Sequence, residues 1–288
     1  MTFQLLKPNS LSEVFQILED FQGEAVLLAG GTDLVPLLRN DAVQPKYIVA
    51  LGRIEGLDEK VTDGRDLCLG PLVTHQQAVR SSLVQQYAAV LAEASGTVGS
   101  LQTRNMGTIA GNLANASPSA DSAPALLVLN AELKLGSRAG EERVPLAAFF
   151  QGPKRTCLKP TQMILEIRFR RLTRLEGAAY VKVGRRSAVT MAVASAAAYV
   201  RLDKSGTAIE ELRLALGSVA PTPLRLYALE RNACGIPCEK VPQVIQPRVR
   251  EGIRPISDIR GTKEYREKIA SVVAGRAVEE AIRRARLH

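Results

Sequence analysis

The sequence predicts an α+β protein in which two small α/β units precede a separate α+β domain. Helical and strand patterns alternate around a glycine turn in the first fifty-odd residues, and a second unit of strands, short helices and a hairpin follows. From about residue 173, strand patterns come first and a helical tail comes last. We therefore expect a first domain over residues 1–172, with subdomains over about 1–56 and 57–172, and a second domain over residues 173–288.

The first unit carries local signals for each of its elements. Ser10 and Glu13 form a capping-box pattern ahead of apolar residues at helical spacing, which predicts a helix. Residues 25–29 and 47–51 are short apolar runs that are typical of buried strands. A double-glycine turn at residues 30–31 follows the first run, and a further helix is expected between the two strands.

The second unit begins with a strand pattern at residues 67–70, which helical spacing follows over residues 74–90. Alternating patterns at residues 132–135 and 143–146 flank a glycine turn and predict a β-hairpin, and residues 163–169 predict another strand.

The expected C-terminal domain has a different order of strand and helix patterns. Residues 180–183 and 211–217 are strand-like, an alanine-rich run occupies residues 190–200, and residues 262–286 have helical periodicity.

The composition excludes several classes of protein. No apolar run approaches the roughly 18 residues of a membrane span, and the first ten residues lack the pattern of an export signal, so we expect a cytoplasmic protein. Only two histidines are present, and Cys234 and Cys238 form a lone C-x3-C pair, so neither a metal site nor a histidine-based triad is expected. The net charge is +9, but only 4% of the residues are aromatic, which argues against a nucleic-acid surface. The charge suits a phosphate-bearing cofactor or an acidic partner subunit.

Residues 108–121 form the most informative stretch of the chain. Gly111 and Asn112 tolerate a left-handed backbone, and a turn of that kind would point successive N–H groups into one concavity that suits an anion. A second glycine turn, at residues 29–34, lies about eighty residues upstream and is expected to open a helix. Two phosphate-cradling turns predict a dinucleotide whose pyrophosphate is held from two sides.

Three charged or titratable residues have more than one interpretation. Asp121 is either an acceptor for a ribose or ribityl hydroxyl or a turn N–H, or a helix cap. Lys182, in an otherwise apolar strand, is either a cation near the cofactor or a strand residue whose face is wet. His75 lies near an expected helix start and is predicted to be a surface or capping residue. Because no nucleophile elbow, carboxylate pair or Cys–His pair is visible, the chemistry is expected to be redox chemistry carried by a cofactor.

The two glycine motifs, in this order and spacing, resemble those of the FAD-binding subunits of the molybdenum hydroxylases. That family includes xanthine dehydrogenase, aerobic carbon monoxide dehydrogenase and related aldehyde and N-heterocycle dehydrogenases. The resemblance runs nearly end to end and is most specific over residues 108–121. The other matching segments are residues 7–13, 29–34, 47–57, 102–105, 149–152, 217–223 and 261–266.

The resemblance implies the FAD-binding fold of p-cresol methylhydroxylase and vanillyl-alcohol oxidase, made of two small α/β subdomains, followed by the family's α+β C-terminal domain. Two segments are implied to wrap the FAD pyrophosphate, namely Leu27, Leu28, Ala29, Gly30, Gly31, Thr32, Asp33 and Leu34, together with Thr108, Ile109, Ala110, Gly111 and Asn112. Asp121 would take a hydroxyl of the cofactor, Ile164 would pack beside the flavin, and Lys182 would be a polar flavin contact. Ala110 stands where the family's second glycine is usual, which keeps the N–H but limits how closely a phosphate approaches.

The function implied by the resemblance is that of an electron-transfer flavoprotein subunit. A large subunit with a molybdopterin cofactor would oxidise the substrate, and a small subunit would pass single electrons through 2Fe–2S clusters to FAD on this chain. The electrons would then go to NAD or another acceptor. Two alternatives stay open: a stand-alone flavin oxidase or reductase of the same fold, and a basic nucleic-acid-binding or scaffold protein without flavin.

Overall fold

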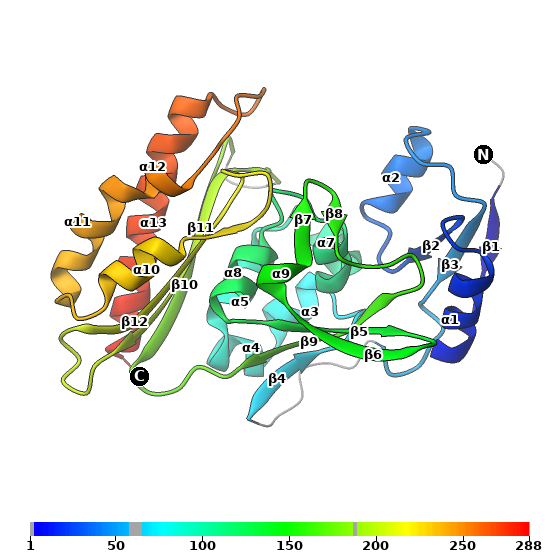
Figure 1. The fold of residues 1–288 in the computed structure, drawn as a ribbon, viewed down its shortest axis with the longest axis horizontal. Helices are drawn as coiled ribbons and strands as arrows, with labels where there is room; N and C mark the ends of the chain where they lie inside the picture. The colour runs from blue at the N-terminus through cyan, green and yellow to red at the C-terminus, as the bar shows by residue number, and fades with distance from the viewer. Residues whose placement is uncertain (1–2, 58–64, 187–188, 288) are drawn as a thin grey trace.

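The computed structural model describes residues 3–57, 65–186 and 189–287. The described chain forms three units, each built around its own sheet, that follow one another along the long axis of the molecule (Figure 1). The first unit is a parallel sheet in the order β1 (Gln4–Leu6), β3 (Tyr47–Ala50) and β2 (Ala25–Leu28). Helices α1 (Leu11–Asp20) and α2 (Leu34–Arg39) connect these strands. Ser10 caps α1 as predicted, because its hydroxyl accepts the N–H of Glu13 at 3.2 Å. The Glu13 carboxylate accepts the N–H of Asn9 at 2.9 Å rather than that of Ser10, so the reciprocal half of the predicted capping box is shifted by one residue.

The second unit contains an antiparallel sheet in the order β4 (Asp66–Leu69), β9 (Met163–Arg170), β5 (Glu132–Ser137) and β6 (Gly140–Pro145). These strands confirm the predicted hairpin and the strands expected near residues 67–70 and 163–169. The helices of the unit are α3 (His75–Arg80), α4 (Ser82–Tyr87), α5 (Ala89–Gly96), α6 (Leu101–Met106), α7 (Ile109–Ala114), α8 (Ser122–Val128) and α9 (Leu146–Phe149), and β7 (Phe150–Gly152) pairs with β8 (Arg155–Thr156).

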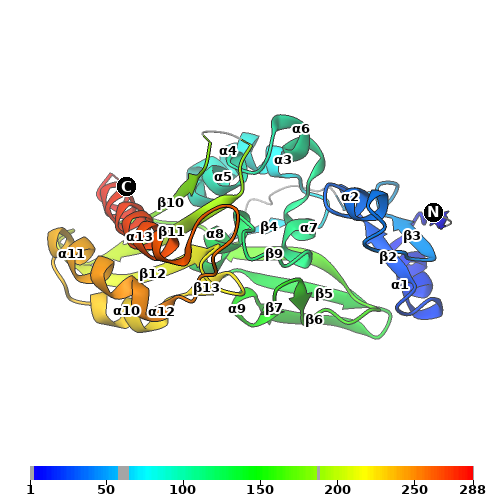
Figure 2. The same ribbon diagram turned by 90° about the horizontal axis from the view of Figure 1, so that it is seen from above.

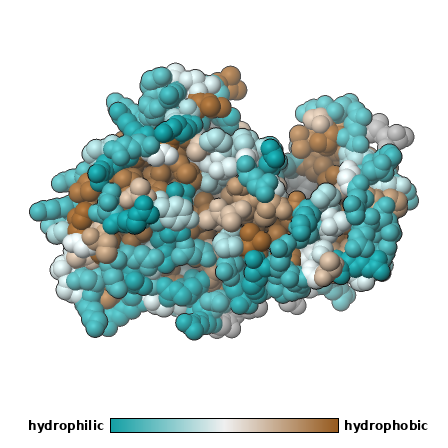
Figure 3. Space-filling view, in the orientation of Figure 1, coloured by the Kyte–Doolittle hydropathy of each residue, from teal (hydrophilic) through white to brown (hydrophobic). Residues whose placement is uncertain are grey.

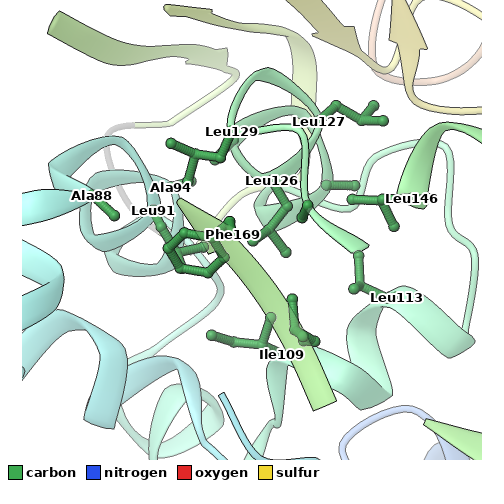
Figure 4. Packing of buried hydrophobic residues seen from close by; sticks show 14 of the residues in the cluster. Ala88, Leu91, Ala94, Ile109, Leu113, Leu126, Leu127, Leu129, Leu146 and Phe169 are labelled. Carbon is green, nitrogen blue, oxygen red and sulfur yellow. The ribbon is translucent and has the colours of Figure 1, made fainter. Parts of the chain in front are cut away.

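The core of the second unit joins its helices to its sheet. Leu126 of α8 and Phe169 of β9 are buried in one cluster with Ile109 and Leu113 of α7 (Figure 4). This packing fixes α7, and therefore the segment around residue 110, against the rest of the unit.

The third unit is an antiparallel sheet in the order β10 (Glu176–Gly184), β11 (Ala192–Leu202), β12 (Ile209–Gly217) and β13 (Leu224–Arg225). It continues into α10 (Tyr227–Ala233), the 3-10 helix η1 (Cys238–Lys240), α11 (Val241–Ile245), the 3-10 helix η2 (Gln246–Arg248), α12 (Val249–Gly252) and α13 (Lys263–Ala285). The predicted strands and the C-terminal helix are confirmed.

The alanine-rich run forms the central strand β11, which lies between α13 on one face of the sheet and α8 on the other (Figures 1 and 2). Both faces of the strand are therefore covered, and small residues let the helices approach closely. A Cβ on Gly177 of the neighbouring β10, for example, would lie 2.2 Å from the Ala281 carbonyl oxygen of α13. Among the described residues, no helix is both long and apolar enough to cross a membrane.

Candidate functional site

A cleft of about 570 Å³ is enclosed by residues from all three units. Its walls come from the turn between β2 and α2, the segment around α6 and α7, the start of β9, and residues 189–191. The volume falls within the range of about 300–1,000 Å³ that is typical of small-molecule and cofactor sites. Polar side chains cover much of the visible surface, whereas apolar residues gather around α2 at the side of the cleft (Figure 3).

Most of the site residues predicted from the sequence line this cleft. They are residues 27–34, Thr108, Ala110, Gly111, Asn112, Asp121 and Ile164. Ile109 does not line the cleft, because its side chain is fully buried in the hydrophobic core (Figure 4). Lys182 does not line it either, and its ammonium group instead contacts a residue that does.

The first glycine turn is held directly against the end of α6. A Cβ on Gly30 would lie 1.8 Å from the Met106 carbonyl oxygen, so no other residue fits there without moving one of the two backbones. Gly31 has a φ of +70°, a conformation that glycine adopts without the strain of a side chain. Within the described part of the chain, the N–H groups of residues 30–33 donate to no protein acceptor, so they are available to a ligand in the cleft.

The second glycine segment has a different conformation from the one predicted. Gly111 and Asn112 are not left-handed, because both lie in helix α7. Two interactions hold the segment helical: Thr108 caps the helix by accepting the Gly111 N–H at 3.0 Å, and Ile109 is anchored in the core. The left-handed residue comes later, at Ala116, with a φ of +45°.

Gly111 nevertheless leaves room for the cap of its own helix. A Cβ at this position would lie 2.7 Å from the Thr108 hydroxyl oxygen that caps α7. Further along the segment, Asn112 orients Ser122 by accepting its hydroxyl at 2.7 Å, and the hydroxyls of Ser117 and Ser119, which line the cleft, are 3.2 Å apart.

Asp121 is the only carboxylate besides Asp33 among the residues that line the described cleft, and it is 7% exposed. It accepts hydrogen bonds from the Lys182 ammonium and from the Tyr180 hydroxyl, each at 2.7 Å. Lys182 also donates to the Thr97 carbonyl at 3.0 Å. Burial raises the pKa of Asp121 above its ordinary value, and the two donors, Lys182 first, offset part of that rise.

This geometry excludes one interpretation of each residue. Asp121 occupies the position before α8 but its side chain makes no capping hydrogen bond, so the helix-cap interpretation is wrong. Lys182 is not a strand residue with a wet face, because its side chain is only 7% exposed and is paired with Asp121. Lys182 therefore lies behind Asp121 as seen from the cleft, and its ammonium offsets the negative charge of that carboxylate.

His75 is neither the surface residue nor the capping residue that the sequence predicted. It is 2% exposed and is the first residue of α3, where Thr74 provides the cap. Its backbone N–H donates to the Gly107 carbonyl at 3.0 Å, which brings the residue into the wall of the cleft. Burial, with a smaller contribution from Arg104, lowers the pKa of His75 to about 4, so the imidazole is neutral near pH 7.

The described residues contain no group of three or more His, Cys, Asp or Glu side chains that could hold a metal ion. The cleft is lined by hydroxyls, by the side-chain amides of Asn112, Asn115 and Gln162, and by the His75 imidazole, besides the backbone N–H groups of the first turn. Hydrogen-bond donors of this kind suit an organic phosphate ligand.

Comparison with known proteins assigns the chain to a family. Residues 1–169 match the FAD binding domain in molybdopterin dehydrogenase, and residues 179–281 match the CO dehydrogenase flavoprotein C-terminal domain. The chain belongs to the FAD-binding medium subunits of the molybdenum hydroxylases. This membership confirms the predicted family and fold class and decides against a nucleic-acid-binding or scaffold protein.

Relatives of this medium subunit match along almost their entire length. It is 31% identical over 281 residues to the glyceraldehyde dehydrogenase medium chain of Sulfolobus acidocaldarius, with 96% of this chain and 98% of that chain covered. It is 30% identical over 282 residues to the carbon monoxide dehydrogenase medium chain of Hydrogenophaga pseudoflava, with 97% and 96% covered.

Solved structures of related enzymes have the same fold as this chain. A chain of carbon monoxide dehydrogenase from Hydrogenophaga pseudoflava lacking the Mo-pyranopterin moiety superimposes with a TM-score of 0.94 at 29% identity, covering 99% of this chain and 98% of that one. A chain of quinoline 2-oxidoreductase from Pseudomonas putida 86 gives a TM-score of 0.91 at 26% identity, covering 99% and 98%.

Proposed function

We propose that this medium subunit holds FAD in the cleft between its glycine segments and passes electrons from a small subunit with 2Fe–2S clusters to NAD or another acceptor. A large subunit with a molybdopterin cofactor would oxidise the substrate. The observation that carries the proposal is the contact between Gly30 and Met106, which joins the two glycine segments into one wall.

The residues present fit FAD as a ligand. The free N–H groups of residues 30–33 and the Ala110 N–H at the start of α7 would hold the pyrophosphate from two sides, because the N–H groups of Ile109, Gly111 and Asn112 already donate within the protein. Asp121 would accept a hydroxyl of the cofactor, because its carboxylate lines the cleft and has lone pairs beyond those that Tyr180 and Lys182 use. Ile164, which is buried in the cleft wall, would pack against the flavin.

Lys182 would act on the flavin through Asp121 rather than by direct contact, since its ammonium is already bound by that carboxylate and by Thr97. When bound, FAD accepts electrons singly and releases them as a pair, which suits transfer from one-electron iron–sulfur clusters to a hydride acceptor. The chain's own residues bind and orient the cofactor and keep a paired positive charge beside it. We also retain the boundary between the FAD-binding and C-terminal domains at residue 172 as a proposal.

Electron transfer from a partner requires a surface where that partner can dock beside the cleft. Val189 and Met191 line the cleft and are 52% and 54% exposed. The loop with Ile256 and Ile259, which are 69% and 90% exposed, is tied to them because Arg260 contacts the Met191 sulfur at 3.3 Å. These four side chains, named here the apolar lip, support a protein partner at this position.

The test is purification of the tagged chain from its native host, with a visible spectrum and mass spectrometry of the proteins that copurify. We expect flavin bands, together with one partner that carries molybdopterin and one that carries iron–sulfur clusters. Flavin on a chain that purifies alone and turns over substrate would contradict the partner proposal. A colourless chain that takes up no added FAD would contradict the cofactor proposal.

A further inference from the structure

His75 occupies the place where the two glycine segments meet. A Cβ on Gly107, the residue just before the Thr108 cap, would lie 3.2 Å from the Thr32 hydroxyl and 3.5 Å from the His75 Cδ2 atom. The imidazole edge, from the start of α3, and the Thr32 hydroxyl, from the first glycine turn, therefore flank the same glycine, and both residues line the cleft.

The backbone of His75 is held firmly in this place. Thr74 and Gln77 form a reciprocal capping box at the start of α3, and the His75 N–H donates to the Gly107 carbonyl at 3.0 Å. The side chain is also 2% exposed, so backbone and ring are both confined before a ligand binds, which limits the ordering cost on binding.

One side-chain contact reaches the ring, and the Ser95 hydroxyl can act in it as donor or acceptor. The fully buried Ser95 hydroxyl lies 3.5 Å from Nδ1, and in the described chain this is the only protein hydrogen bond of the imidazole. When Ser95 donates to Nδ1, the ring proton resides on Nε2. Nε2 is then a donor without a protein acceptor in a residue that lines the cleft.

The ring stays neutral, with one proton rather than two, because its surroundings disfavour a positive charge. Burial and the nearby Arg104 guanidinium disfavour the imidazolium. Arg104 itself is occupied by the Gln76 side chain and by the Val98 and Gly99 carbonyls, so it stays beside the ring rather than reaching into the cleft.

We propose that His75 binds the cofactor as a neutral donor, giving its Nε2–H to a pyrophosphate oxygen at the junction of the two glycine segments. This inference rests on the proposed FAD function and adds a binding residue to it. A neutral donor suits the position because the turn N–H groups already supply positive potential, while an unpaired buried cation would have to be desolvated in the ligand-free chain.

The experiment compares three variants of the full chain, stripped of flavin, in equilibrium binding to FAD, ADP and riboflavin. ADP carries the pyrophosphate, and riboflavin carries the flavin ring without any phosphate. His75→Leu removes the donor, His75→Gln keeps an N–H near the Nε2 position, and His75→Asn keeps an amide only near the Nδ1 position. Thermal melting of each ligand-free variant reports whether the fold is kept.

We expect His75→Leu and His75→Asn to weaken FAD and ADP binding roughly ten- to hundredfold, as for the loss of one hydrogen bond to a charged acceptor. Riboflavin affinity should be unchanged, and His75→Gln should bind FAD within about threefold of the unmodified chain. If His75→Leu does not fold, the Asn and Gln variants make the same comparison.

The inference is overturned if both donor-deficient variants bind ADP as tightly as the unmodified chain. It is also overturned if they lose riboflavin and ADP to the same extent, since that pattern indicates a purely structural role. If the unmodified chain binds none of the three ligands, the proposed function itself fails, and the two failures are thereby distinguished.

Discussion

Replacing Gly30 with alanine tests the contact on which the proposed site depends. The added methyl carbon would lie 1.8 Å from the Met106 carbonyl oxygen and 2.6 Å from its carbonyl carbon. Both atoms belong to the backbone at the end of α6, so neither can move aside by a side-chain rotation. Because non-bonded heavy atoms rest at about 3.5 Å, the two segments must separate by more than about 1 Å.

This separation has two expected consequences. Overpacking costs about 1–3 kcal/mol of stability, and we expect the upper end because only backbone can yield. The pyrophosphate would then be gripped from one side, and the loss of two charge-assisted hydrogen bonds at about 1.5 kcal/mol each weakens FAD binding roughly a hundredfold.

The assay is FAD titration followed by flavin fluorescence, with urea unfolding of the same samples. Gly52→Ala is the matched control, because a Cβ at Gly52 in the same unit meets nothing within 4 Å. Gly30→Ala should lose both affinity and stability while Gly52→Ala keeps both. A Gly30→Ala chain with FAD affinity and unfolding midpoint equal to those of the control would refute the idea that the two segments form one wall.

Three further perturbations test other parts of the site. Gly111→Val should reduce FAD affinity severely and stability by about 1–3 kcal/mol, because its Cβ would displace the Thr108 hydroxyl that caps α7 and would lie 2.7 Å away. Normal FAD affinity in this variant would contradict a role of α7 in binding the cofactor. Since the pKa of His75 is lowered to about 4, the unfolded chain binds more protons between pH 6.5 and 4, and stability should fall as the pH is lowered through that window. Urea unfolding from pH 7 to 4.5 should show this slope, diminished in His75→Gln; equal slopes would contradict a neutral buried ring. Ile259→Glu, at a side chain 90% exposed, should leave FAD affinity and stability unchanged but reduce recovery of the partner subunits in pull-down; undiminished recovery would exclude the apolar lip as the docking surface.

The sequence alone determined the features that depend on neighbouring residues. Capping signals, alternating apolar positions and helical spacing predicted α1, the β5–β6 hairpin, β9 and α13, because caps and amphipathic periodicity act over a few residues. The two glycine segments also predicted the position of the cleft from local sequence. Glycine and small polar residues are typical of places where a backbone must approach another group closely.

Only the tertiary structure decided the conformation of the second glycine segment. Gly111 tolerates both helical and left-handed backbone. It is helical in the structure because Ile109, two residues earlier, is buried in a core assembled from distant elements. The pairing of Lys182 with Asp121 and the burial of His75 beside Gly107 likewise join residues far apart in the chain. No local pattern encodes such contacts, because the free energy of burying and pairing these groups exists only once the distant segments have come together in the folded chain.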